Sequence, residues 1–327
     1  MRRAVLTILI LGFLLIVAIF GGVAFGSERL GFFEILCALT GGSCGLSAEQ
    51  TAILFDIRLP RILLGACIGA ALALSGASYQ SLLRNPLADP YLLGISNGAA
   101  VGTMLALVFF GGALWARPAF AFAGAALATL VVYNLARSRA GMNVERLILS
   151  GVIVTTFLSS AIALLTSLLD ATRLRTFTFW LLGDLANASK DSLAVAFFAV
   201  AAGIFILLTQ ARALNLMMLG ERDAFDFGVE VGRVRLIVFL TASVLVGASV
   251  AASGSVGYVG LVIPHLVRLS AGSDNRLVIP ASALAGAAFV VVADTVARTA
   301  IAPRELPVGA ITALIGAPLF IYLLRKN

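Results

Sequence analysis

The chain has 327 residues, of which 61% are hydrophobic and only 12% are charged. Soluble domains carry about 25% charged residues, so this composition excludes a soluble enzyme or binding module and indicates an integral membrane protein. The net charge is +7, but the basic residues are spread over many short polar segments. A nucleic-acid-binding protein would gather them in one patch, so that class of function is a poor fit.

Apolar segments of about 20 residues, the length that crosses a bilayer as a helix, follow one another along the chain. A shorter apolar piece, 256–269, is interrupted by glycines and by Pro264 and brings the expected crossings to about ten. Little remains for an extramembrane domain, so we predict an all-α integral membrane protein with a single transmembrane domain over 1–327. The longer spans are expected at 5–25, 62–83, 91–110, 118–136, 146–169, 191–209, 235–256, 277–297 and 307–324.

The first span follows two arginines, as a signal peptide would, but its length and the absence of a clear Ala-x-Ala site favour a retained helix. Because lysine and arginine are enriched in cytoplasmic loops, the basic residues favour an even number of crossings with both termini in the cytoplasm. The outer connections are then 26–57 and 170–190, and the latter is expected to hold a short surface helix around Trp180.

The three cysteines carry less information. Cys37 and Cys44 share the first outer loop, where an oxidising compartment could join them in a disulfide. Cys67 falls within a span and is expected to be a packing residue.

A spacing recurs in the two halves of the chain. Ten residues separate Gly76 from Pro86, and ten separate Gly254 from Pro264; both glycines follow a serine and a helix of small residues. Helices that are repeated and broken by proline are typical of transporters built from two related halves, and we predict such an architecture here.

The chain lacks an energy source of its own. A phosphate-binding Walker loop needs a lysine after Gly-x-x-x-x-Gly, but Lys190 and Lys326 are the only lysines and neither follows a glycine. The single histidine, His265, excludes two-histidine zinc motifs, and we expect neither catalytic residues nor a bound metal or cofactor. The pore must therefore take its energy from a partner.

Two rival functions remain. An ion-coupled secondary transporter would use Asp294 as its proton or sodium site, although such carriers usually have more acidic residues within their spans. An intramembrane enzyme ranks last, because no histidine or lysine lies near a serine nucleophile in the sequence.

The longest cytoplasmic connection, 212–232, mixes apolar residues with charged ones. Such a segment suits two short amphipathic helices lying in a cleft of a soluble protein, and an interfacial helix resting on lipid headgroups is the alternative. Gly220, Gly228 and Gly232 favour the compact arrangement, since glycine readily ends a short helix.

Hydroxyl side chains recur along the fifth span, at Ser150, Thr155, Thr156, Ser159 and Ser160. They could line a pathway for a large solute. Small polar residues equally serve helix–helix packing in membranes, and packing is preferred for most of them.

Several motifs occur together and in order, from about residue 50 to the end. They resemble those of the FecCD permeases, the membrane subunits of type II ATP-binding-cassette (ABC) importers that carry ferric siderophores, haem or cobalamin. The motifs are Ile57-Arg-Leu-Pro-Arg, Ser75-Gly-Ala-x-x-Gln, Asn85-Pro-Leu-Ala-Asp-Pro, Leu93-Gly-Ile-Ser-Asn-Gly, Gly257-Tyr-Val-Gly-Leu-Val-Ile-Pro-His, Glu305-Leu-Pro-Val-Gly and Gly316-Ala-Pro-Leu-Phe.

The resemblance implies a bacterial inner-membrane protein that works in an assembly. Family members form homodimers of ten-helix protomers, with the pathway along the dimer axis. Two ATPase subunits bind the cytoplasmic face and use the ATP, and a periplasmic binding protein delivers the metal chelate to the outer face. The motifs do not fix which chelate is carried.

The resemblance also implies roles for particular residues. Arg58, Arg61 and Arg298 match arginines that dock the binding protein through its glutamates, and all three fall at outer helix ends in the expected topology; anchoring at the lipid interface is the alternative. His265 belongs to a motif shared whatever the cargo, which favours local packing over haem ligation. Asn85 and Leu87 match the loop that closes the inner mouth, and the ATPase coupling region corresponds to Leu219, Gly220, Glu221, Ala224 and Gly228, with Phe227 where relatives often have leucine.

Overall fold

A computed structural model of the protein describes residues 2–26, 31–40, 46–111, 113, 115–138 and 141–326. Seven helices are long and apolar enough to cross a membrane, and three shorter apolar helices accompany them. The prediction of an all-α protein with about ten crossing helices is confirmed. These helices are α1 (Arg2–Ala24), α4 (Leu59–Leu82), α5 (Ile95–Phe110), α6 (Ala116–Ala136), α7 (Val144–Thr166), α9 (Lys190–Leu219), α11 (Val231–Ser253), α12 (Val259–Ala271), α13 (Asn275–Thr299) and α14 (Val308–Lys326).

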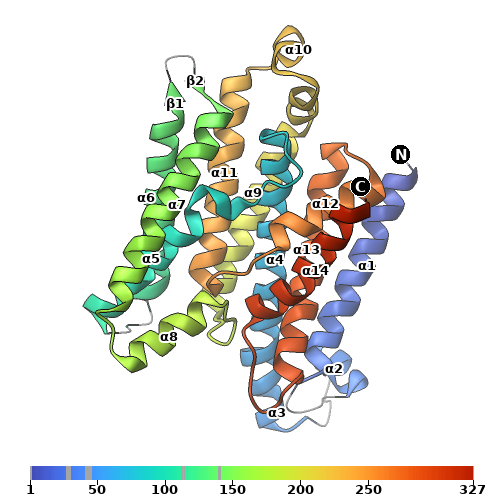
Figure 1. Ribbon diagram of the computed structural model, residues 1–327. Coiled ribbons are helices and arrows are strands. Elements are labelled where there is room, and N and C mark those ends of the chain that lie inside the picture. The colour runs from blue at the N-terminus through green and yellow to red at the C-terminus, as the bar shows by residue number, and fades with distance from the viewer. Residues whose placement is uncertain are drawn as a thin grey trace.

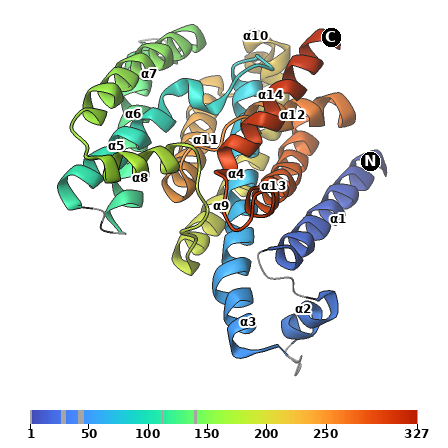
Figure 2. The same cartoon turned by 60° about the horizontal axis from the view of Figure 1, so that its bottom comes forward.

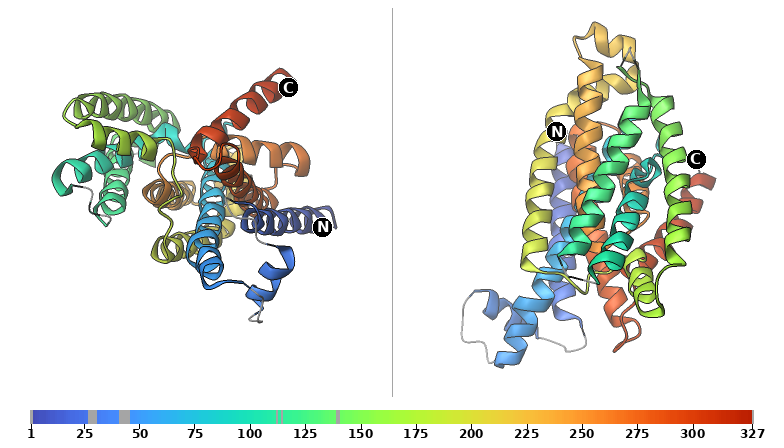
Figure 3. Two further views of the ribbon diagram at one scale, coloured as in Figure 1. Left: turned by 90° about the horizontal axis from the view of Figure 1, so that it is seen from below. Right: turned by 90° about the vertical axis from the view of Figure 1, so that its left-hand side faces the viewer.

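The central helix is α4, which α9, α11, α12 and α13 surround (Figures 1 and 2). At its start, α4 continues α3 (Ala48–Ala52) through a π-helical turn over Ile53–Arg58. Helix α1 lies at one edge against α13, and α5, α6 and α7 form a separate group on the opposite side (Figure 3). The centre of the protein is therefore α4, while α1 and α7 form its margins.

The two ends of the molecule carry different short elements (Figure 1). Helix α10 (Glu221–Asp226), the hairpin of β1 (Arg137–Ser138) and β2 (Gly141–Met142), and both termini lie toward one end, called the α10 end below. Helices α2 (Phe32–Leu39), α3 and α8 (Ala171–Leu181) lie at the other, called the α8 end. Helix α8 is the short helix predicted around Trp180.

Glycines allow the helices to cross at very short range. A Cβ atom on Gly69 would lie 2.1 Å from the carbonyl oxygen of Gly286 in α13, and one on Gly76 would lie 1.8 Å from that of Gly260 in α12. Small residues at such crossings let helix backbones approach in membranes, where no hydrophobic effect drives association. Pro264 has no N–H to offer the Gly260 carbonyl four residues earlier, and that carbonyl lies against Gly76 instead.

The recurring ten-residue spacing does not mark equivalent positions in the helices, so the spacing itself is not a sign of two related halves. Gly76 lies inside α4 and Pro86 lies in the loop after it, whereas Gly254 ends α11 at a φ of 69° and Pro264 lies inside α12. Gly76 is needed for close packing inside a helix. Gly254 has a positive φ that favours glycine, and an added Cβ there would also lie 1.9 Å from the carbonyl oxygen of Trp180.

The apolar span predicted to end at residue 209 is part of a longer helix, because α9 continues without a break to Leu219. The 212–232 segment therefore holds one separate short helix, α10, rather than two. Gly220 ends α9, and Gly228, at a φ of 80°, follows α10, while Gly232 lies within α11.

Cys44, one of the two cysteines that a disulfide could join, lies outside the described residues. Cys67 is a free, half-buried thiol in α4.

Candidate functional site

The first candidate site is an ionic cluster at the α8 end, centred on Asp294 in α13. One carboxylate oxygen of Asp294 accepts hydrogen bonds from Nε and Nη2 of Arg61 at 3.0 and 2.9 Å. The other accepts one from Nε of Arg298 at 2.9 Å. Asp294 is only 1% exposed, so its charge is stabilised by the two guanidinium groups rather than by water.

Arg298 of this cluster and a further arginine, Arg58, also cap α1. Arg58 donates to the carbonyl of Val23 at 3.0 Å, and Arg298 donates to the carbonyl of Gly22 at 3.0 Å. The last carbonyls of a helix have no partner within the helix, and they lie at the negative end of its dipole. The two guanidinium groups therefore fasten the end of α1 to α4 and α13.

The position of these arginines differs from the expected one. Arg58, Arg61 and Arg298 are all buried in the protein rather than presented at the surface or to lipid. The exposed member of the cluster is Glu305, whose carboxylate accepts a hydrogen bond from Arg61 at 2.8 Å and whose side chain is 46% exposed. A docking role for the arginines stays a prediction. The two carboxylates that accompany Arg61 come from Asp294 and Glu305, more than 200 residues further along the chain, which local sequence patterns do not reveal.

The second site is the loop after α4, at the α10 end. Asn85 and Leu87 are exposed there, and the Asn85 side chain accepts a hydrogen bond from the backbone N–H of Leu87 at 2.9 Å. Pro86 and Pro90 prevent α4 from continuing, so the chain turns back to the short helix Pro90–Leu93 and then to α5. The loop is exposed and compactly turned, as a closing element at the mouth of a pathway would be.

The third site is α10 and the extension of α9 that precedes it. Ala224 is buried, whereas Leu219, Glu221, Phe225 and Phe227 are exposed. Helix α10 projects at the tip of the molecule (Figure 1), and large exposed apolar side chains on such a tip are typical of a protein–protein contact. Phe225 was not among the residues predicted for this region, and the fold identifies it by its exposure on the tip.

The α9 extension is held in place by Asn215. Its side-chain oxygen accepts from the backbone and side-chain N–H groups of Asn275, both at 2.8 Å, and its amide donates to Asp274 at 2.6 Å. The backbone N–H of Arg276, together with that amide, holds the pKa of Asp274 below its ordinary value. The base of the α10 region is thus tied to the start of α13.

The hydroxyl residues predicted as pathway candidates divide into two groups on α7. Ser150 is buried, and the Thr155 hydroxyl is buried without a hydrogen-bond partner. Thr156 and Ser159 are exposed, and Ser159 accepts a hydrogen bond from the Asn97 side chain of α5 at 2.8 Å. Most of the remaining α7 surface is exposed, so within one chain this helix is covered only on the side that faces α5 and α6.

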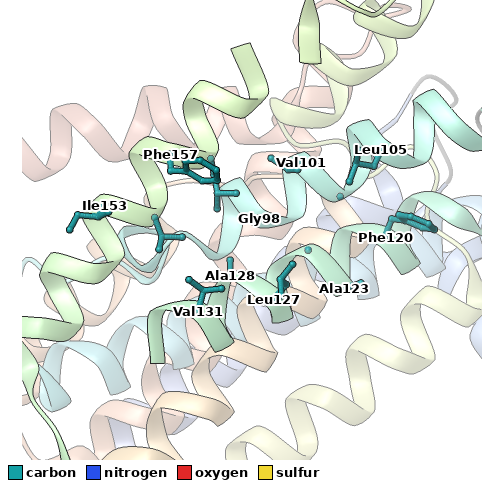
Figure 4. Close-up of a pocket in the computed structure, with 14 residues that line it drawn as sticks. Gly98, Val101, Leu105, Phe120, Ala123, Leu127, Ala128, Val131, Ile153 and Phe157 are labelled. Atoms are coloured by element: carbon teal, nitrogen blue, oxygen red, sulfur yellow. The ribbon is translucent and has the colours of Figure 1, made fainter. Parts of the chain in front are cut away.

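A cavity of about 540 Å³ lies among α5, α6 and α7. Figure 4 shows Val101, Leu105, Phe120, Leu127 and Phe157 around it, with only carbon in the side chains drawn. Such a lining has no polar group to bind a metal chelate, so this cavity is not a candidate cargo site.

His265 lies on α12, edge-on to Phe320 of α14, with ring centroids 6.1 Å apart. The described residues contain no group of His, Cys, Asp and Glu side chains that could hold a metal ion. The aromatic contact agrees with a packing role for His265.

The comparison with family models identifies the protein family to which the chain belongs. The model described as the FecCD transport family matches residues 14–326. The chain belongs to the FecCD transport family. The residues that match the FecCD model include the α8-end cluster, the loop after α4 and the α10 region.

FecCD relatives match nearly the whole chain. The hemin transport system permease protein HmuU of Yersinia pestis is 40% identical over 324 residues, 98% of this chain and 96% of its own length. The cobalamin import system permease protein BtuC of Halobacterium salinarum is 44% identical over 283 residues, 86% of this chain and 76% of its own length.

The fold agrees with a solved structure described as an inward-facing conformation of a metal-chelate type ABC transporter. That structure has a TM-score of 0.87 and 33% sequence identity, and the match covers 98% of this chain and 99% of the other. The type of fold predicted from the FecCD motifs is therefore confirmed.

Proposed function

We propose that this chain is the membrane-spanning permease of an ABC importer that passes a bulky metal chelate into the cytoplasm. The observation that carries the proposal is the 40% identity to the hemin permease over 98% of the chain. The lack of a Walker lysine supports it, since ATP hydrolysis must then come from a separate subunit.

The arrangement around Asp294 argues against the alternative of an ion-coupled carrier. Asp294, the acidic residue that such a carrier was expected to use, is only 1% exposed. Both of its carboxylate oxygens already accept hydrogen bonds, one from Arg61 and the other from Arg298. A transported ion that used this carboxylate would have to displace a guanidinium group.

The assembly that we propose has two copies of this chain in the bacterial inner membrane. Two ATPase subunits bind its cytoplasmic face, and a periplasmic binding protein binds its outer face. The largely uncovered α7, with Thr156 and Ser159 on its open surface, supports a second copy that would close a pathway around it. The exposed apolar tip of α10 supports an ATPase contact there. In the proposed assembly both termini, which lie toward that end, are cytoplasmic, and the binding protein docks at the α8 end.

The cargo class follows from relatives that are named for hemin and for cobalamin. Haem, cobalamin and ferric siderophores are all large metal chelates. The test is uptake into vesicles that contain the native complex, isolated through a tag on this chain, with hemin, cyanocobalamin and a ferric hydroxamate supplied separately. ATP-dependent uptake of one chelate is expected; uptake of none of the three, but of a small ion, would refute the proposal.

Docking of the binding protein at the cluster makes a prediction about Glu305. Its carboxylate binds the Nη1 group of Arg61 that a carboxylate of the binding protein would use. Glu305→Gln removes this competing charge, which is worth ~1 kcal/mol. The affinity for the binding protein should therefore increase about fivefold. Surface plasmon resonance with the binding protein from the native complex measures it. Glu49→Gln removes the same charge at the same end and should change affinity by less than about twofold; equal effects of both changes, or weaker binding in Glu305→Gln, would contradict the docking role.

A further inference from the structure

One carboxylate oxygen at the α10 end is shared by arginines from two other elements. Oε1 of Glu221, the first residue of α10, accepts from Nη2 of Arg84 at 3.0 Å and from Nη2 of Arg235 in α11 at 2.6 Å. Arg84 stands immediately before Asn85, in the loop predicted to close the inner mouth. A displacement of Glu221 must therefore either carry Arg84 with it or break their contact.

The backbone at Arg84 is unusual for an arginine. The N–H of Asn85 bonds to the carbonyl of Gln80 at 3.1 Å, and the N–H of Arg84 bonds to that of Ser81 at 3.3 Å. This pair of bonds is the Schellman ending of a helix, in which the residue at the Arg84 position is usually glycine because its φ is positive. Arg84 has a φ of 48°, which is unfavourable for a residue with a side chain. The arginine is thus kept where the backbone favours glycine, which points to a use for its side chain.

The other arginine connects the same carboxylate to α7. Arg235 is buried and also donates to the carbonyl of Met142 in the hairpin. Met142 directly precedes Asn143, whose side chain caps α7 by accepting from the N–H of Arg146 at 3.0 Å. Glu221 is therefore the point where α10, the loop after α4, α11 and the start of α7 meet.

The two contacts of Glu221 differ in strength. The side chains of Glu221 and Arg84 are 44% and 42% exposed, whereas that of Arg235 is 8% exposed. A half-exposed ion pair contributes little to stability, so the Arg84 contact can break and re-form. The contact with buried Arg235 keeps the carboxylate in place, since losing it would leave a buried cation without its partner.

We infer that Glu221 transmits the displacement of α10 to the inner-mouth loop through Arg84. The inference rests on the proposed function, in which the ATPase moves α10. Because Arg84 precedes Asn85, and Asn85 holds the backbone of Leu87, the loop moves as a unit with the Arg84 side chain. The contact between Arg84 and Glu221 thus positions the loop and contributes little to the stability of the fold.

Arg84→Gly is the variant that separates these two roles. Glycine suits the positive φ, so the helix ending is retained and the melting temperature should not fall, while the link to Glu221 is lost. The native complex with hemin and cyanocobalamin as probes should then hydrolyse ATP with at least a tenfold lower uptake of chelate per ATP. Arg84→Lys, which keeps a cation of similar reach, should restore part of the ratio.

A labelling experiment reads the loop directly. In the native complex, maleimide labelling of Leu87→Cys should differ between the nucleotide-free and the vanadate-trapped states, and adding Arg84→Gly should make the two rates equal. The complex without Leu87→Cys gives the background from the native cysteines. Arg212→Gln, at an exposed arginine of α9 that forms no ion pair among the residues described, controls for the loss of one positive charge in Arg84→Gly and should keep the parent behaviour.

The outcomes distinguish the inference from the proposal beneath it. Unchanged uptake per ATP and state-dependent labelling in Arg84→Gly would overturn the link and leave the importer proposal standing. A parent complex that hydrolyses no ATP and takes up no chelate would overturn both.

Discussion

Replacing Asp294 with alanine is expected to lower the free energy of unfolding by about 3–5 kcal/mol, because it leaves two buried arginines without their anion. Arg61 and Arg298 both donate to this carboxylate, and Arg298 also caps the end of α1. The change should therefore loosen α1 from α4 and α13 as well. Thermal unfolding of the purified protein in detergent measures the effect.

A matched control for Asp294→Ala is provided by another ion pair at the α8 end. Asp56 and Lys190 lie 2.8 Å apart with both side chains largely exposed, so Asp56→Ala should cost less than about 1 kcal/mol. A loss of stability in Asp294→Ala no larger than in Asp56→Ala would contradict the structural role of the cluster.

Replacing Gly76 with alanine is the second change with a large expected effect. The added Cβ would lie 1.8 Å from the carbonyl oxygen of Gly260, and both atoms of that contact are fixed to helix backbones. Helices α4 and α12 would have to separate along their shared face, at a cost of about 3 kcal/mol. The expected result is a large fall in the melting temperature, or loss of folded protein after extraction from the membrane.

The control for Gly76→Ala is Gly12→Ala. Gly12 lies in α1, where nothing is within 4 Å of an added Cβ atom, and alanine favours a helix over glycine by about 1 kcal/mol. Gly12→Ala should therefore keep or raise the melting temperature. Equal tolerance of both substitutions would show that α4 and α12 do not cross as closely as described.

The number and order of the crossing helices could be predicted from the sequence, because lipid imposes a minimum apolar length on each span. Helix ends were harder to predict. The apolar run near 209 gives way to mixed composition, but no glycine or proline follows until Gly220, so α9 continues beyond the apolar stretch. The end of a hydrophobic segment is thus not the end of a helix.

The candidate sites were predictable only where the signal is local. The prolines at 86 and 90 indicate a broken loop wherever they occur. The surroundings of Arg61 could not be predicted, because its partners come from residues 294 and 305. The contact between Arg84 and Glu221 likewise joins residues 137 positions apart, and only the packing of α4 against its neighbours brings them together.

The most direct test of the account compares this chain in sealed liposomes alone and in its native complex. Chelate uptake should require the ATPase subunits, the binding protein and ATP, and the purified chain should neither hydrolyse ATP nor concentrate hemin or cyanocobalamin in the presence of a proton or sodium gradient. Concentration of either chelate by the chain alone would contradict the claim that separate ATPase subunits drive it.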